Sequence, residues 1–170
     1  EKECPILLLD DVFSELDSER RAKLINFTAK AQTIITCTDH QNLAKTDAVY
    51  IFPDGVKDID SEAFANAMYL ESVVIPDGVT IIAFQTFCDC PNLTSVTIPD
   101  SVTTIYDYAF YGCSSLKSII IPDSVTHLDW GVFNRCTSLE SVVIGDGVKI
   151  IGVDAFNRCI NLESVTIGKN

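Results

Sequence analysis

The sequence predicts an α/β chain in which a short β-α-β segment, residues 1–49, precedes a parallel β-solenoid of about five 23-residue coils, residues 50–170. Three observations carry this prediction for the second part: a strict 23-residue period, an alternation of apolar and polar residues within each period, and a turn sequence at a fixed place in it. The first part lacks the period and follows a strand, helix, strand pattern. The chain therefore divides into two regions.

The 23-residue period is marked by leucine, phenylalanine, isoleucine and valine, and no insertion interrupts it. The recurring positions are Leu70, Leu93, Leu116, Leu139 and Leu162; Phe64, Phe87, Phe110, Phe133 and Phe156; Ile75, Ile98, Ile121, Ile144 and Ile167; and Val56, Val79, Val102, Val125 and Val148. One coil cannot bury its own apolar face, so such a period predicts stacked coils whose strands pair in parallel about 4.8 Å apart.

The unit that begins at Leu93 shows what each period encodes. Apolar and polar residues alternate, which predicts a half-buried strand with Leu93, Val96 and Ile98 pointing inward. The Pro-Asp-Ser or Pro-Asp-Gly that follows is typical of a turn. A second apolar stretch, Val102 to Ile105, leads into Phe110 and is predicted to end in a single helical turn, because the space is too short for a standard helix.

The repeats IPDSVTTIYDYAFYGCSSLKSI and IPDSVTHLDWGVFNRCTSLESV resemble the BspA-like leucine-rich repeats of bacterial proteins, many of them displayed at the cell surface. The resemblance covers about residues 51–170 in five copies, with Ala67 in place of Cys in the first copy and Gly145 in place of Pro in the fifth. It implies a leucine-rich-repeat-like fold, and a protein that binds a partner rather than one that catalyses a reaction.

The first region is predicted to contain a strand at Ile6 to Leu9, a helix at about residues 18–29 and a strand at Thr33 to Cys37. Its segments PILLLDDVFSELDSERR and QTIITCTD resemble the C-terminal end of the ATPase head of RecF, a recombination mediator. That resemblance implies that Ile6 to Leu9 is the Walker B strand and that Ser14 to Asp17 is the D-loop.

By the same resemblance Asp10 would hold Mg²⁺ through water and Asp11 would take the place of a water-activating carboxylate. The chain has no GK[ST] loop to cradle phosphates, so no catalytic residue is predicted and no cofactor is expected. The preferred interpretation is a remnant that caps the first coil. The alternative is a RecF-type DNA-repair ATPase fragment whose Asp10 and Asp11 contribute to a composite ATP site with another chain.

Charge and composition narrow the partners. Residues 51–170 carry six Lys and Arg against fifteen Asp and Glu, a net charge of −9, so we expect no direct nucleic-acid binding by the solenoid. No apolar run approaches the about 20 residues that a membrane span needs, which predicts no membrane insertion. The RecF-like segment and the cysteine usage favour the cytoplasm, with the cell surface as the alternative. The oligomeric state stays open.

Stacking turns each repeat position into a column of neighbours. Cysteines at one position are predicted to be reduced core thiols, although a disulfide between coils is geometrically possible, and Cys88 is predicted to be the most exposed thiol. The column consists of Cys90, Cys113, Cys136 and Cys159. The aspartates Asp77, Asp100 and Asp123 form another column, predicted to shape turns, with a Ca²⁺ site as the alternative.

Partner binding is expected where the repeats differ, because the shared positions build the scaffold. Phe84 and Trp130 occupy one variable column, and Tyr106 and Tyr108 lie close by. Aromatic side chains of this kind supply contact area at low entropy cost, although packing within the fold would also explain them. The outward face of the strand ladder, with Ile120 and Val143, is the second candidate. The predicted partner is a protein or a carbohydrate.

Overall fold

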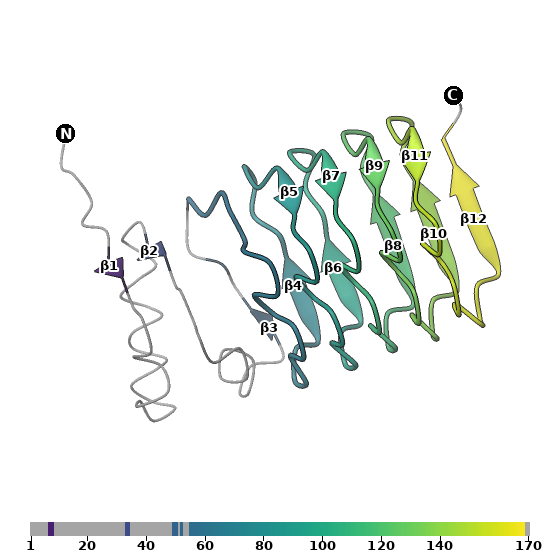
Figure 1. Ribbon diagram of the computed structural model, residues 1–170, viewed down its shortest axis with the longest axis horizontal. Helices are drawn as coiled ribbons and strands as arrows, with labels where there is room; N and C mark the ends of the chain where they lie inside the picture. Colours follow the sequence, from purple (N-terminus) through teal and green to yellow (C-terminus); the bar gives the residue numbers. More distant parts are fainter. Residues whose placement is uncertain (1–6, 9–32, 35–48, 51, 53–54, 169–170) are drawn as a thin grey trace.

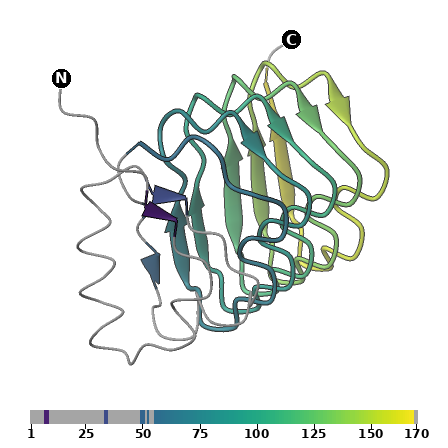
Figure 2. The same cartoon turned by 60° about the vertical axis from the view of Figure 1, so that its left-hand side comes forward.

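The computed structural model describes residues 7–8, 33–34, 49–50, 52 and 55–168. Residues 55–168 wind into a parallel β-solenoid whose coils stack along the long axis of the molecule (Figure 1). Each coil contributes one strand to each of two ladders and closes through a series of turns (Figure 2). The predicted solenoid is therefore confirmed.

All strands of the solenoid, β3 to β12, pair in parallel with partners 23 residues apart, as Ile120 and Val143 do. The first ladder divides into two three-stranded sheets, β3-β4-β6 and β12-β10-β8. Its strands are β3 (Val49–Tyr50), β4 (Ser72–Val74), β6 (Ser95–Thr97), β8 (Ser118–Ile121), β10 (Ser141–Ile144) and β12 (Ser164–Ile167). The second ladder has the order β11-β9-β7-β5. Its strands are β5 (Ile81–Ile82), β7 (Thr104–Ile105), β9 (His127–Leu128) and β11 (Ile150–Ile151).

The solenoid makes about four complete turns, where the repeat count predicted about five coils. The difference arises because five copies of a strand position, β4 to β12, enclose four intervals of 23 residues. β3 adds a strand position before β4, since Val49 pairs with Ser72, but residues 51 and 53–54 of that coil lie outside the described residues. The 23-residue length of the coil is as predicted.

The core is built from the repeated apolar columns. Phe87, Phe110 and Phe133 are fully buried and stack face to face, with ring centroids 5.4 and 5.5 Å apart. Leu93 and Ile98 of β6's coil are buried and Val96 is partly buried, so the predicted inward direction of this strand is confirmed. Stacked coils thus remove from water a face that one coil would leave exposed.

The predicted helical turn before Phe110 is wrong, because the chain there forms a series of tight turns and no helix occurs among the described residues. Two repeat positions adopt positive φ, which interrupts a right-handed helix. One column contains Glu62, Gln85, Tyr108, Gly131 and Asp154, and the other contains Asn66, Asp89, Gly112, Arg135 and Arg158. The residue types vary too much along either column to signal this conformation in the sequence.

In the first region, β1 (Leu7–Leu8) pairs in parallel with β2 (Thr33–Ile34), and both fall within the predicted strands. The predicted helix at residues 18–29 lies outside the described residues, as do Asp10 and Asp11. Among the described residues, no helix has the length and apolar character needed to cross a bilayer.

Candidate binding surfaces

The outward face of the first ladder carries a stripe of exposed β-branched side chains. Ile120 is 67% exposed and Val143 is 43% exposed, and the two residues are direct partners in neighbouring strands. Val74 extends the stripe on β4. The strand alternation sends these side chains to solvent because their neighbours Ile119, Ile121 and Val142 fill the core. The predicted outward orientation of this face is therefore confirmed.

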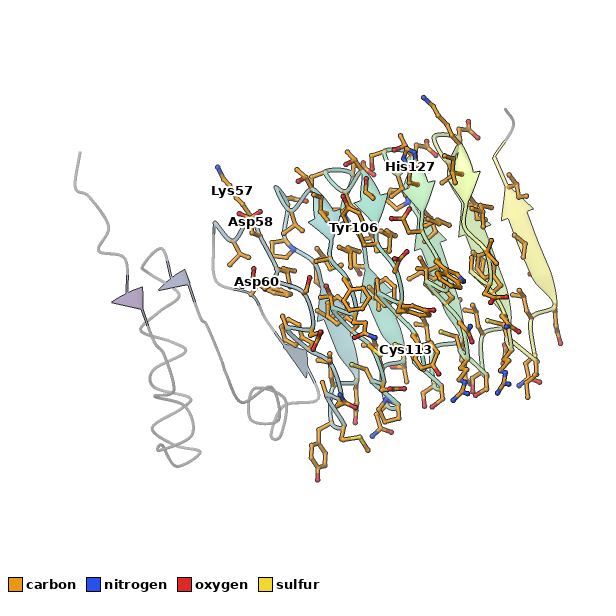
Figure 3. The ribbon with its side chains drawn as sticks, in the orientation of Figure 1. Lys57, Asp58, Asp60, Tyr106, Cys113 and His127 are labelled. Atoms are coloured by element: carbon orange, nitrogen blue, oxygen red, sulfur yellow. The ribbon has the colours of Figure 1, made fainter. Side chains whose placement is uncertain are left out.

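A second surface follows the strands of the second ladder, where each coil turns away from the sheet. We call it the aromatic edge and define it as residues 60–62, 83–85, 106–108, 129–131 and 152–154. Three of its aromatic side chains stand in solvent, with Phe84 40%, Tyr106 42% and Trp130 50% exposed. Figure 3 shows Tyr106 directly after β7 and His127 on β9, which places the edge beside the second ladder.

Three rings of the aromatic edge contact one another across three coils. Tyr108 meets Phe84 edge to face, with ring centroids 6.4 Å apart, and lies tilted against Trp130 at 6.1 Å. Such contacts are worth about 0.5–1.5 kcal/mol each beyond the area that they bury. The rings are therefore held as a group, and Tyr108 is its centre.

The position of Tyr108 depends on a glycine in the next coil. Gly131 has a φ of +61°, and a Cβ added there would lie 2.6 Å from the Tyr108 ring. Tyr108 itself has a φ of 57°, which is costly for an aromatic residue. The ring thus lies close to the Gly131 backbone and contacts Phe84 and Trp130, which explains why Tyr108 is only partly exposed.

Carboxylates lie between the aromatic rings. Asp107 occupies the same column as Phe84 and Trp130, and its Oδ1 accepts a hydrogen bond of 2.8 Å from the backbone N–H of Trp130. Partial burial and the nearby Asp107 raise the pKa of Asp129, whereas His127 lowers it. Asp107 and Asp129 therefore act on each other electrostatically at the aromatic edge.

The aromatic cluster continues around the coil through Tyr111. Its ring meets Tyr108 edge to face at 5.7 Å, and the Arg135 guanidinium stands 5.5 Å from the Tyr111 ring centroid. The structure thus brings together Phe84, Tyr108 and Trp130 among the predicted site residues. Tyr106 lies on the same edge but contacts no other aromatic ring of the described residues, whereas Ile120 and Val143 belong to the separate first-ladder face.

Sequence reasoning did not assign a role to Asp107, Asp129 or Arg135. The signal was present for Asp107, because it stands 23 residues after Phe84 and 23 before Trp130 in the variable column. The contact between Arg135 and Tyr111 joins different repeat positions of neighbouring coils, so counting in steps of 23 does not reveal it.

The cysteine column forms a thiol ladder inside the solenoid. Each Sγ donates a hydrogen bond of 3.1 to 3.2 Å to a phenylalanine carbonyl of the preceding coil: Cys90 to Phe64, Cys113 to Phe87, Cys136 to Phe110 and Cys159 to Phe133. All four cysteines are free thiols. Burial raises the pKa of the Cys113, Cys136 and Cys159 thiols, and that of Cys159 reaches about 11. The predicted core position is confirmed for Cys90, Cys113 and Cys136, and Cys159 is partly buried.

Cys88 is buried, at 7% exposure, so the prediction that it would be the most exposed thiol is wrong. Its Sγ lies 3.7 Å from Oδ2 of Asp89, and burial together with that carboxylate raises the pKa of Cys88 to about 12. The left-handed Asp89 turns the chain immediately after Cys88. Cys159, in the last coil, is the more exposed thiol.

The aspartate column lies at the turns between the two ladders. Oδ1 of Asp123 accepts a hydrogen bond of 2.9 Å from the backbone N–H of Asp146 in the next coil, which accords with the predicted turn role. Asp77, Asp100 and Asp123 are exposed. In the part of the chain that the structure describes, no three His, Cys, Asp or Glu side chains are grouped so that they could hold a metal ion.

The first region is similar to part of RecF. A stretch of 53 residues, 29% of this chain, is 53% identical to the DNA replication and repair protein RecF of Halothermothrix orenii and covers 14% of that protein. A stretch of 43 residues is 56% identical to RecF of Clostridium botulinum and covers 12% of it. The likeness is local, because this chain spans less than a seventh of either protein.

The solenoid is similar to solved leucine-rich repeat structures. The leucine-rich repeat protein of T. pallidum superposes with a TM-score of 0.68 at 33% identity, over 74% of this chain and 60% of that one. A leucine-rich cell surface protein of Faecalibacterium prausnitzii gives a TM-score of 0.67 at 33% identity, over 75% of this chain and 33% of that protein. The pneumococcal vaccine antigen PcpA gives a TM-score of 0.66 at 28% identity, over 78% of this chain and 35% of that protein. This chain spans 60% or less of these three proteins.

Residues 57–170 match the family described as the BspA type leucine rich repeat region, in six copies. The matched stretch covers the 23-residue period, the parallel ladders and the stacked phenylalanine core. The chain therefore belongs to the BspA type leucine-rich repeat family.

Proposed function

We propose that this protein is a non-catalytic interaction module that binds a protein or carbohydrate partner, with the aromatic edge as its principal contact surface. The observation that carries the proposal is the exposure of Phe84, Tyr106 and Trp130 on one side of the coils. Exposed aromatic groups of this kind are typical of binding surfaces, where Trp and Tyr supply much of the contact energy.

The aromatic edge also has the rigidity that a binding surface needs. Its rings contact one another, and Asp107 tethers the backbone of Trp130 to the preceding coil. Partner binding then orders few side chains, so less conformational entropy is lost on association. The stripe that contains Ile120 and Val143 supports a second contact surface on the first ladder.

A comparison of two double variants tests this proposal. Phe84→Ala with Trp130→Ala removes aromatic area from the edge, and Ile120→Ser with Val143→Ser removes apolar area from the other face. Each protein would be applied to a glycan array and to an array of bacterial and host proteins, and bound amounts compared with the unmodified chain. We expect the first pair to lose binding and the second to retain most of it. Unchanged binding by the first pair would exclude the aromatic edge as the contact surface.

The RecF-like segment supports a second candidate function. We propose as the alternative that Asp10 and Asp11 contribute Walker B to an ATP site completed by another chain, on the strength of the local identity to RecF. Calorimetric titration of Mg-ATP tests it, with Asp10→Ala, Asp11→Ala as the control. Heat that disappears in this variant would support a phosphate site. Absence of heat, alone and with a RecF-type head added, would reject this alternative.

A cytoplasmic location is our proposal for the chain, on the basis of the RecF-like segment and the free thiols. One solved relative is described as a cell surface protein, which supports the opposite location. Cell fractionation with an antibody to the solenoid, combined with protease treatment of intact cells, decides between them. Protection from protease would support the cytoplasm, and digestion would support surface display.

A further inference from the structure

We infer that the aromatic edge recognises a basic protein segment, with Arg or Lys side chains stacked on its rings and paired with Asp107 and Asp129. This inference rests on the proposed function and names the partner class for the same surface. It follows from the charge of the edge, from the arrangement of rings and carboxylates, and from a contact that the protein already makes within itself.

The charge of the aromatic edge has one sign. Its fifteen positions include the five acidic residues Asp60, Glu62, Asp107, Asp129 and Asp154 and contain no Lys or Arg. The edge thus has a formal charge of −5, a third of the acidic residues of the solenoid region. A surface of this kind attracts cations and repels phosphate-bearing ligands, which raises the encounter rate with a basic partner.

The carboxylates and the rings alternate in space. Along one column Asp107 stands between Phe84 and Trp130, and along the neighbouring column Asp129 stands next to Tyr106 in the adjacent coil. An Arg or Lys head group between two coils would therefore meet a ring and a carboxylate together. Attraction of a cation to an exposed aromatic face strengthens binding by about two- to fivefold.

The protein already pairs a guanidinium with a tyrosine ring next to the edge. Arg135 stands 5.5 Å from the Tyr111 ring centroid, and Tyr111 in turn contacts Tyr108. Tyr106 and Trp130 offer exposed ring surface, and within the described residues no Lys or Arg stands over either ring. Cationic side chains of a partner could therefore stack on Tyr106 and Trp130 in the way that Arg135 stacks on Tyr111.

Trp130 is the single tryptophan of the chain and reports directly on this surface. The test titrates the full chain with a synthetic peptide of alternating Gly and Arg, with an equally long peptide of alternating Gly and Gln, and with a neutral cello-oligosaccharide, while Trp130 fluorescence is recorded. We expect saturable change with the Arg peptide alone, weakened by added salt.

Two charge variants locate the site. Asp107→Asn with Asp129→Asn keeps the size of both side chains and an oxygen acceptor for the Trp130 N–H, and should weaken Arg-peptide binding about tenfold, as expected for two partly exposed ion pairs. Glu140→Gln with Glu163→Gln removes the same charge beside the first ladder, where both residues are exposed. This control pair should weaken binding less than about twofold.

Three outcomes would overturn the inference: no fluorescence change with the Arg peptide, equal binding by the Asp107→Asn, Asp129→Asn variant, or an equal loss in the two variants. A response to the Gln peptide or to the oligosaccharide without one to the Arg peptide would reject the basic partner and leave the binding surface in place. Failure of the binding surface itself is decided separately, by the array comparison of the Phe84→Ala, Trp130→Ala variant.

Discussion

The interior columns and the aromatic edge follow opposite rules in the same coils. In the interior, Phe87, Phe110 and Phe133 repeat one residue type and one geometry, with nearly parallel rings at 5.4 and 5.5 Å. On the edge, the column of Phe84, Asp107 and Trp130 changes residue in each coil, and the rings meet at interplanar angles from 35° to 83°. Stacking explains the first group completely and leaves the second group exposed.

This difference distinguishes the residues that stabilise the fold from the residues that the fold exposes to a partner. A repeated column adds the same interface at each step, so the stability of a solenoid grows with the number of such interfaces. A variable column adds no regular interface and leaves its residues available for a partner. Substitutions in the interior should therefore change stability, and substitutions on the edge should change binding.

Phe110→Ala should produce the largest loss of stability. Phe110 stacks on both neighbours and is fully buried, so truncation should cost about 3–5 kcal/mol of unfolding free energy. Phe156→Ala is the matched variant in the last coil, where the ring is partly buried and stacks on Phe133. It should cost about half as much, because it removes one ring contact. Urea unfolding followed by circular dichroism measures both, and equal losses would contradict the nearest-neighbour description.

Gly131→Ala should have the next largest effect, because this substitution strains the backbone of the coil and also displaces Tyr108 on the aromatic edge. The left-handed φ of +61° costs an L side chain about 1–2 kcal/mol, and the added methyl group pushes Tyr108 away from Trp130. Gly112→Ala is the control, since Gly112 also has positive φ and faces the Asp89 side chain instead of a ring. Both variants should lose similar stability, but only Gly131→Ala should alter Trp130 fluorescence. An unchanged Trp130 signal would show that Tyr108 does not depend on this glycine.

The interior was predictable from the sequence and much of the edge was not. A 23-residue period specifies the register of each parallel pair, and it led to Ile120 and Val143 as outward neighbours. The left-handed column of Gln85, Tyr108 and Gly131 shares no residue type, so its conformation leaves no repeated signal. The left-handed Asp89 that follows the buried Cys88 belongs to the second such column, which has no common residue type either. The contact between Tyr108 and Gly131 joins residues of two neighbouring coils, so the conformational propensity of either segment alone does not predict it.

Alkaline pH should weaken the interior through its thiols. Burial raises the pKa of Cys159 to about 11 and that of Cys88 to about 12, against 9.0 for an unperturbed thiol. Above pH 9 the unfolded chain loses these protons while the folded chain keeps them, so unfolding becomes easier as the pH rises. The thiol contribution to the unfolding free energy should be constant below pH 9 and should fall as the pH rises toward 11.

Lys and Tyr side chains titrate in the same range, so Cys159→Ser serves as the control for the thiol contribution. The slope of unfolding free energy against pH should be shallower in this variant, because one proton fewer is released on unfolding. Urea titrations through the interval from 9 to 11 measure the slopes. Identical slopes would mean that Cys159 ionises equally well in the folded chain.

The double variant Phe84→Ala, Trp130→Ala should have the smallest effect on stability and so gives the strictest test of the comparison. Both rings are two-fifths to one-half exposed, and no repeated column depends on them, so the loss should stay near the lower limit for their two contacts with Tyr108, about 1 kcal/mol of unfolding free energy. Circular dichroism during urea unfolding measures this without a tryptophan signal. A loss as large as that of Phe110→Ala would mean that the edge rings hold the coils together, and the exposed aromatics would then belong to the scaffold instead of to a binding surface.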